Sequence, residues 1–346
     1  MKTTSVTLKT LTLAAAAAAF TLASPPAVNA VDYWIAPDGR TTIAHRVVHS
    51  TTGGVPEDVI IGWDGEEAIV DIVSGGLIEC SRVGYVGHVG PGTVNVYEGG
   101  AFTAGHTIFV GENDPGYLNV LGGHVSSMHF YIGQIYGVAG SVTVVGPTAT
   151  MNVSGELVVG LSDDGELVVS DAGGVDVSNL YIDWYGRVAL NSGGALSADN
   201  LMTESGAQLF IGGNSLLSVS HDFAIEGVLE FTFAVSPAVT AGKIRLGNTG
   251  FIDFAESALT ILAEGEFAFG DRILVLEGAP VDGLWGYDPI IADTGQVFDI
   301  SYDELNAGVY ETYLVARAIP EPSTYALIGG VGALALAMGA RWRRRR

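Results

Sequence analysis

The chain has 346 residues, a formal net charge of −23, 48 glycines and a single cysteine, Cys80. Between residues 31 and 319, eight basic residues stand against 37 acidic ones, a net charge of −29. Such an acidic body disfavours binding to nucleic acid or anionic lipid, and one cysteine excludes an intramolecular disulfide. The glycine content is typical of a β protein with many corners, in which we expect Cys80 to be a small buried residue.

Residues 1–30 have the three parts of a secretory signal peptide. Lys2 and Lys9 form the positively charged region, residues 11–22 form the apolar region, and small residues lead up to Ala30. We therefore expect cleavage after Ala30, so that the mature chain starts at Val31 and is exported.

Residues 31–65 hold Tyr33, Trp34 and two turn segments around Gly39 and Pro56. We interpret this stretch as a polar-faced N-terminal cap, because the open end of a β repeat array is an edge that aggregates. An irregular first coil follows, with expected strands at 69–73 and 83–86.

From residue 66 to residue 270 one pattern recurs, a glycine followed by apolar residues two and four places later. The pattern starts at Gly92, Gly116, Gly140, Gly165, Gly186, Gly227 and Gly250, with a weaker start at Gly206. Successive starts are 24, 24, 25, 21, 20, 21 and 23 residues apart, a period typical of repeat architectures. At Gly206 the apolar residues come one place late, which indicates a bulge or an error in our register.

Within each repeat, apolar and polar residues alternate, which predicts strands rather than helices. A second apolar pair follows in most repeats, at Ile108/Val110, Phe130/Ile132, Leu157/Val159 and Leu180/Ile182. Paired glycines between the strands supply the backbone freedom of tight corners. Two or three short strands per repeat form one coil of a solenoid, so we predict an all-β parallel β-helix, or β-solenoid.

After residue 270 the pattern changes to longer strands separated by Gly and Asp turns. The strands are expected at 272–276, 296–300 and 310–316. We interpret residues 271–319 as a C-terminal β cap with antiparallel pairing.

Residues 320–346 have a composition of their own. Pro320, Glu321 and Pro322 lead into an apolar run over 325–340, and the chain ends in an arginine cluster over 341–346. A run of this length is just long enough to cross a thin bilayer as a helix. The arginines place the C-terminus in the cytoplasm, so residues 324–340 are predicted to anchor the chain in the inner membrane with its body outside.

These three parts in this order resemble the PEP-CTERM sorting signal of Gram-negative bacteria. The resemblance implies recognition of Pro320, Glu321 and Pro322 by exosortase, a membrane protease-transpeptidase, and release to the cell surface or extracellular matrix. It also implies an association with extracellular polysaccharide. The repeats between residues 65 and 270 resemble, more loosely, those of autotransporter passengers and other PEP-CTERM proteins.

Enzymes that cleave polysaccharides also use parallel β-helices, and their sites need clustered carboxylates, with a Lys or Arg alongside in the lyases. The best candidates here are Arg187 near Asp183, and Arg245 near Asp253; Lys243 is the only lysine of the body. Scattered carboxylates more often serve solubility, so we expect no catalytic residues.

Acidic residues at two corners could hold Ca²⁺, namely Asp163-Asp164 and Glu112-Asn113-Asp114. The nonapeptide calcium repeat is absent, so Ca²⁺ remains an alternative to plain acidic corners, and no cofactor is expected. His106 and His129 are expected to align on successive coils, whereas His88 and His124 do not share their offset. A stacked pair of imidazoles is a simpler interpretation than a zinc site.

Two groups of aromatic residues could stack on sugar rings if they are exposed. The first comprises Tyr181, Trp184 and Tyr185 beside Asp183, and the second comprises Phe130, Tyr131 and Tyr136. We expect a non-enzymatic surface or matrix protein, structural or adhesive, associated with exopolysaccharide. The alternative is a polysaccharide lyase or glycoside hydrolase on a β-helix scaffold.

Overall fold

The computed structural model describes residues 33–317, except for short internal segments. These segments are 36–38, 44–45, 50–57, 63–64, 135–137, 226–229, 236–241, 248–251, 254–257, 264–266, 269, 279–280, 283–289, 293–295 and 307–308. The sorting motif Pro320, Glu321 and Pro322, the cleavage site at Ala30 and the apolar run over 324–340 lie outside the described residues. No helix long and apolar enough to span a bilayer occurs in the part of the chain that is described.

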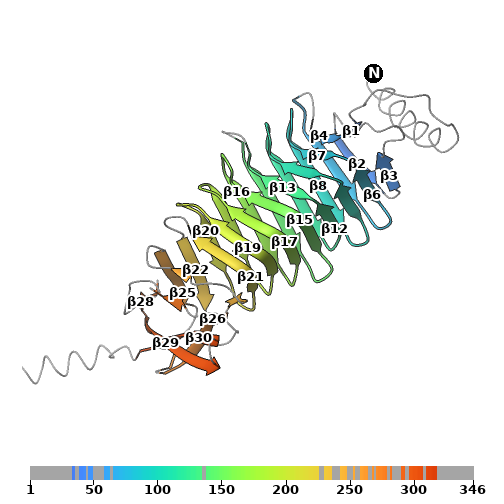
Figure 1. The fold of residues 1–346 in the computed structure, drawn as a ribbon. Coiled ribbons are helices and arrows are strands. Elements are labelled where there is room, and N and C mark those ends of the chain that lie inside the picture. Colours follow the sequence, from blue (N-terminus) through green and yellow to red (C-terminus); the bar gives the residue numbers. More distant parts are fainter. Residues whose placement is uncertain are drawn as a thin grey trace, which may run out of the picture.

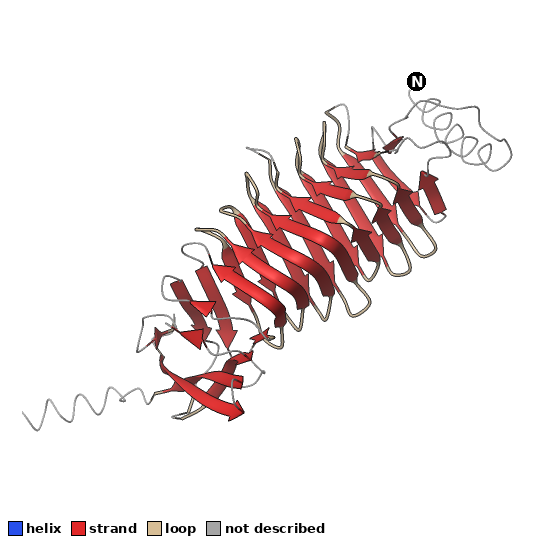
Figure 2. Cartoon of the chain, in the orientation of Figure 1, coloured by secondary structure: helices blue, strands red, loops and turns tan. Residues whose placement is uncertain are grey.

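The described elements are strands that wind into a parallel β-solenoid, as predicted from the repeats (Figures 1 and 2). One face is a ten-stranded sheet to which each coil contributes one strand. Its strands are β2 (Gly39–Ile43), β5 (Ala68–Ile72), β8 (Gly92–Tyr97), β11 (Gly116–Leu121), β14 (Gly140–Val145), β16 (Gly165–Ser170), β18 (Gly186–Leu190), β20 (Gln208–Ile211), β22 (Glu230–Val235) and β25 (Ala258–Ala263).

The other strands of the coils form two parallel ladders of one larger sheet. The first ladder comprises β3 (Arg46–His49), β6 (Leu77–Cys80), β9 (Ala101–Ala104) and β12 (His124–Ser127), and the second comprises β1 (Tyr33–Ile35), β4 (Val59–Ile61), β7 (Val83–Val86), β10 (Thr107–Val110) and β13 (His129–Ile132). Both ladders continue in long bent strands, β15 (Thr150–Val159), β17 (Gly174–Ile182), β19 (Ala195–Thr203) and β21 (Leu216–Ile225). Each coil is therefore three-sided.

Two apolar columns of the ten-stranded sheet fill the interior of the solenoid, and parallel pairing stacks them residue on residue. The columns are Val70, Val94, Leu118, Val142, Leu167, Val188 and Leu209, and Ile72, Val96, Val120, Val144, Val169, Leu190 and Ile211. All of these side chains are buried, and each contributes about 1.5–3 kcal/mol of transfer free energy.

Steric crowding explains why a glycine leads the repeats. A Cβ at Gly116 would collide with the carbonyl oxygen of Val86, and one at Gly140 with that of Val110. At these two positions the strand start passes so close to the preceding coil that only a residue without a side chain fits.

The structure corrects three of the predicted repeat starts. The apolar residues after Gly206 align as Val188↔Leu209, so the repeat begins at Ala207, which is buried, and there is no bulge. The strand expected from Gly227 is shifted by two places, because Leu209 pairs with Phe231. The strand of the ten-stranded sheet expected from Gly250 is instead β25; β24 (Ile252–Asp253) pairs separately with β27 (Val281–Asp282).

The two ends of the array differ in their pairing. Strands β1, β2 and β3 pair in parallel with β4, β5 and β6, so the described part of the segment expected as a cap already belongs to the coils. At the other end, β23 (Lys243–Leu246) pairs in parallel with β26 (Arg272–Gly278). Antiparallel strands then follow, with β30 (Val309–Ala316) between β26 and β29 (Val297–Asn306), and β28 (Ile290–Ile291) on β29.

Candidate functional site

The acidic and basic residues expected to form a catalytic cluster are not brought together around Asp183. Arg187 forms an ion pair with Glu166 at 3.1 Å, one coil away in the same outward row. The Asp183 Oδ1 atom accepts the backbone N–H of Trp184 at 2.7 Å, which shapes the turn before β18. Asp183 therefore supports a turn rather than a pair with Arg187.

A mixed basic and acidic cluster does exist near the C-terminal end of the solenoid. Lys243 Nζ lies 2.8 Å and Arg245 Nη2 lies 3.4 Å from Glu277 Oε2. The hydrogen bond from Lys243, helped by Arg245, lowers the pKa of Glu277. Glu277 is therefore a paired carboxylate and a poor general acid at neutral pH. The side chain of Asp253, the expected partner of Arg245, lies outside the described residues.

The acidic corners considered for Ca²⁺ bind other groups of the protein. Glu112 pairs with His88 of the coil before it. The carboxylate of Asp163 accepts the backbone N–H groups of Val138 at 3.0 Å and of Asp164 at 2.7 Å. No group of three or more His, Cys, Asp or Glu side chains suited to a metal occurs among the residues that the structure describes.

Two of the histidines lie on successive coils, as predicted. The ring centroids of His106 and His129 are 5.1 Å apart, and Glu156 Oε2 lies 3.8 Å from His129 Nδ1. His124 Nδ1 instead contacts the hydroxyl of Thr150 at 2.9 Å. The histidines thus connect neighbouring coils in pairs, which is the arrangement of a ladder.

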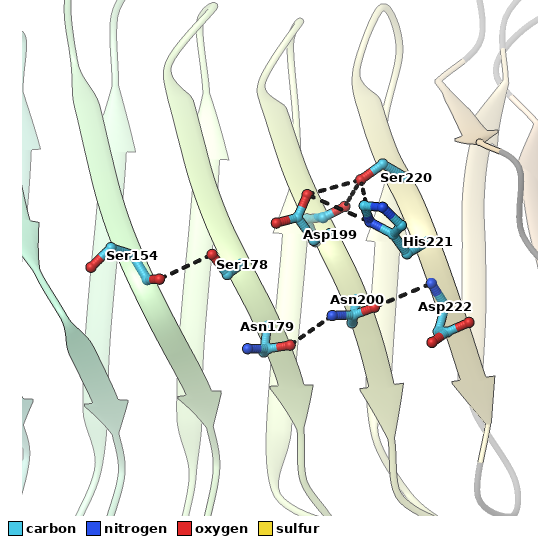
Figure 3. Close-up of polar contacts among 9 residues, drawn as sticks. Ser154, Ser178, Asn179, Asp199, Asn200, Ser220, His221 and Asp222 are labelled. Atoms are coloured by element: carbon cyan, nitrogen blue, oxygen red, sulfur yellow. Dashed lines mark hydrogen bonds and ion pairs between the residues drawn. The ribbon is translucent and has the colours of Figure 1, made fainter.

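Polar side chains at the bend of the long strands also form contacts from one coil to the next (Figure 3). Asn200 donates to Asn179 at 2.8 Å and accepts the backbone N–H of Asp222 at 3.3 Å, so three coils are joined in a row. The Ser220 hydroxyl donates to Asp199 at 3.0 Å on the neighbouring coil. His221 Nδ1 lies 3.3 Å from Ser220 Oγ and 3.8 Å from Asp199 Oδ1, so these three exposed side chains meet in one small cluster, whereas the asparagine contacts run along the solenoid.

The aromatic residues considered for sugar binding divide into exposed and buried ones. Trp184 and Tyr185 are 58% and 47% exposed, on the turn between β17 and β18, and Tyr181 is partly buried. Phe130 is fully buried in the core, as a member of the apolar pair Phe130/Ile132, and therefore cannot contact a sugar. Tyr136 lies outside the described residues.

Tyr131 belongs to an aromatic ladder that the sequence analysis missed. The ring of Phe109 stacks on Tyr85 at 5.3 Å and on Tyr131 at 5.2 Å, with interplanar angles of 14° and 21°. These rings turn their faces toward one another, so the middle ring has no free face for a sugar. The ladder could have been found from the sequence by comparing residues at equal positions in successive repeats.

Cys80 is buried, and burial raises the pKa of its thiol to about 12. Such a thiol is protonated at neutral pH and unsuited to nucleophilic chemistry.

Among the predicted site residues, the exposed turn of Trp184 and Tyr185 is the best-formed aromatic contact surface. No family model, no curated protein and no solved structure matches the chain.

Proposed function

We propose that the chain is an exported structural or adhesive protein of the cell surface or extracellular matrix, associated with exopolysaccharide. In this proposal, signal peptidase cuts after Ala30, and residues 324–340 hold the chain in the inner membrane. An exosortase-type protease then recognises Pro320, Glu321 and Pro322 and releases the body. The observation that carries the proposal is the C-terminal order of Pro-Glu-Pro, apolar run and arginine cluster.

The solenoid supports the structural part of the proposal. Its polar side chains bond from coil to coil, as Asn179 and Asn200 do, and thereby stiffen the column. Its acidic surface keeps a protein with many exposed β positions soluble outside the cell. The exposed pair Trp184 and Tyr185 offers rings for stacking on sugars.

The intact mass of the surface-associated protein in its native host tests this proposal. A mass that lacks residues 1–30 and the arginine cluster supports both processing steps, whereas retention of residues 341–346 would rule out sorting by cleavage. Replacing Pro320, Glu321 and Pro322 together by alanine should trap the chain in the inner membrane. Replacing the exposed Pro147 by alanine is the matched control and should leave export unchanged.

The cluster of Lys243, Arg245 and Glu277 favours a second candidate, a polysaccharide lyase or hydrolase. This cluster combines basic side chains with a carboxylate, as the sites of such enzymes require, and it lies where β26 joins the solenoid. Release of unsaturated uronate or reducing ends by the purified chain, lost in Lys243→Ala and retained in the control Arg187→Ala, would establish this candidate. Unchanged release in both variants, or none at all from the parent, would exclude this cluster as a lyase site.

A further inference from the structure

The long strands carry a hollow on their outward face, away from the aromatic turn. Their parallel register sets Thr150, Gly174, Ala195 and Leu216 side by side in one outward row. The two small residues in the middle of this row leave a depression of about 220 Å³ between Thr150 and Leu216. A second outward row forms its rim, with Asn152, Asp176, Ser197 and Ser218.

The hollow is not a requirement of the fold. A Cβ built on Gly174 would have no heavy atom within 4 Å, and the backbone φ of Gly174 is not positive. Its neighbours in the row, Thr150 and Ala195, carry side chains in the same strand geometry. A larger residue would therefore fit at 174, and the glycine keeps open a space that the solenoid does not need.

The chemistry of the hollow suits one ring of an amino sugar. The floor at Gly174 and Ala195 is smooth and apolar, as the face of a hexopyranose ring requires. The exposed rim residues Asn152 and Ser197 offer an amide and a hydroxyl for ring hydroxyls. Between them Asp176 is exposed and has no ion-pair partner among the described residues, so its carboxylate is available to a cation.

We propose that this hollow binds a hexosamine unit of an amine-bearing polysaccharide. Asp176 accepts a charge-assisted hydrogen bond from the sugar ammonium group, and the ring lies over Gly174 and Ala195. The net charge of −29 between residues 31 and 319 disfavours polyanionic chains and favours this class. The inference rests on the proposed function for its setting outside the cell, and it assigns the polysaccharide class and the site.

Titration calorimetry of the full chain in neutral detergent, with glucosamine hexamer as the probe, tests the proposal. Gly174→Thr fills the hollow without changing the net charge and should weaken binding at least about tenfold, since the ring loses its place. Ala101→Thr puts the same side chain in the same outward row, three coils away, and should bind as the parent does. The Ala101 variant separates filling the hollow from a general effect of threonine on this face.

The role of the carboxylate is tested by a second matched pair. Asp176→Asn should weaken binding about tenfold, the worth of one charge-assisted hydrogen bond. Asp171→Asn removes the same charge from an exposed turn with φ of 50°, which asparagine also adopts, and should leave binding within about twofold of the parent. N-acetylglucosamine hexamer, which lacks the ammonium group, should bind weakly to all variants.

The proposal is overturned if the parent does not bind glucosamine hexamer, or if Gly174→Thr binds as tightly as the parent. Equal losses in Asp176→Asn and Asp171→Asn would also overturn it, because they would indicate attraction to the overall negative charge. None of these substitutions lies in the sorting motif or at Ala30. The intact mass therefore tests export and tail removal independently of the sugar-binding proposal.

Discussion

Four described non-glycine residues have positive φ, and each lies in a turn of the solenoid. The clearest case is Ala172, with φ of 65°, in the turn before β17. The register Gly174↔Ala195 makes Ala172 the equivalent of Gly193, whose φ is 84°. An alanine in this conformation costs about 1–2 kcal/mol because its Cβ approaches the following carbonyl oxygen.

Ala172→Gly should therefore stabilise the protein. The relief of strain exceeds the entropy that glycine adds to the unfolded chain, so the free energy of unfolding should rise by about 0.5–1 kcal/mol. Urea denaturation of the two proteins measures the difference. Ala195→Gly, at the start of β19 where φ is not positive, is the control and should lower the free energy of unfolding by about 0.5–1 kcal/mol. A loss of stability in Ala172→Gly would contradict the account of this turn.

At the scale of strands, one polar row ties four coils together at the N-terminal end of the ten-stranded sheet. Arg40 on β2 donates two hydrogen bonds to Asp71 on β5. Asn95 on β8 donates to Asp71 at 2.8 Å, and Asn119 on β11 donates to Asn95 at 2.9 Å. The hydrogen bond from Arg40, helped by Asn95, lowers the pKa of Asp71 although burial acts in the opposite direction.

This row predicts a pH dependence with a definite sign. The pKa of Asp71 is lower in the folded than in the unfolded chain. Asp71 therefore adds to the free energy of unfolding at a pH above its unfolded-state pKa, and this contribution is lost as the pH falls through its folded-state pKa. Asp71→Asn should lower the free energy of unfolding at pH 7 by about 1–2 kcal/mol and should flatten its decrease between about pH 5 and pH 2. The exposed Asp176→Asn is the control, and an identical acid profile in Asp71→Asn and the parent would refute the prediction.

A glycine and a phenylalanine on strands of neighbouring coils pack against each other in the core. Gly84 on β7 lies between Val59 and Ile108 in its column, and a Cβ at this position would come 2.7 Å from Cζ of Phe102 on β9. The ring thus occupies the volume that the glycine leaves free. The large and the small residue are complementary, as close packing requires.

Gly84→Ala should lower the free energy of unfolding by about 1–3 kcal/mol through overpacking. Phe102→Leu should cost a similar amount, and the double variant should be more stable than the sum of the two losses, with a coupling of about 0.5–3 kcal/mol. Gly174→Ala, where an added Cβ meets nothing, is the control and should not destabilise. Strict additivity of the two core substitutions in denaturation would contradict the proposed shared volume.

For the molecule as a whole, the sequence predicts the solenoid because its main determinants are local. Alternation and the glycine at each strand start mark β8, β11, β14, β16 and β18 correctly, since a crowded start excludes any side chain. The start at Gly206 was wrong because this coil has an alanine, Ala207, at the position where the coils just before it have a glycine, so the glycine signal is absent there. Toward the C-terminus, β24 and β25 could not be assigned because the connections change length between coils.

The surfaces of the molecule were harder to predict than its core. Thr150, Gly174 and Ala195 come from three successive coils of unequal length, and only the exact register brings them into one hollow. Tyr85 and Phe109 likewise become neighbours only through the stacking of β7 on β10. Lys243 and Glu277 become neighbours because β26 pairs with β23, and the repeat pattern of the sequence does not predict this pairing.

The central claim is that these repeats stack in register along one axis, and a distance between two coils tests it most directly. Thr93, Tyr117, Ser141, Glu166, Arg187 and Gln208 form one outward row, so five strand spacings separate its ends. With Cys80→Ser as background, spin labels at Thr93→Cys and Gln208→Cys should show one narrow distance, for a Cα separation of about 24 Å at about 4.8 Å per strand. A broad distribution, or a distance beyond about 40 Å as expected of separate domains, would contradict the stacked solenoid.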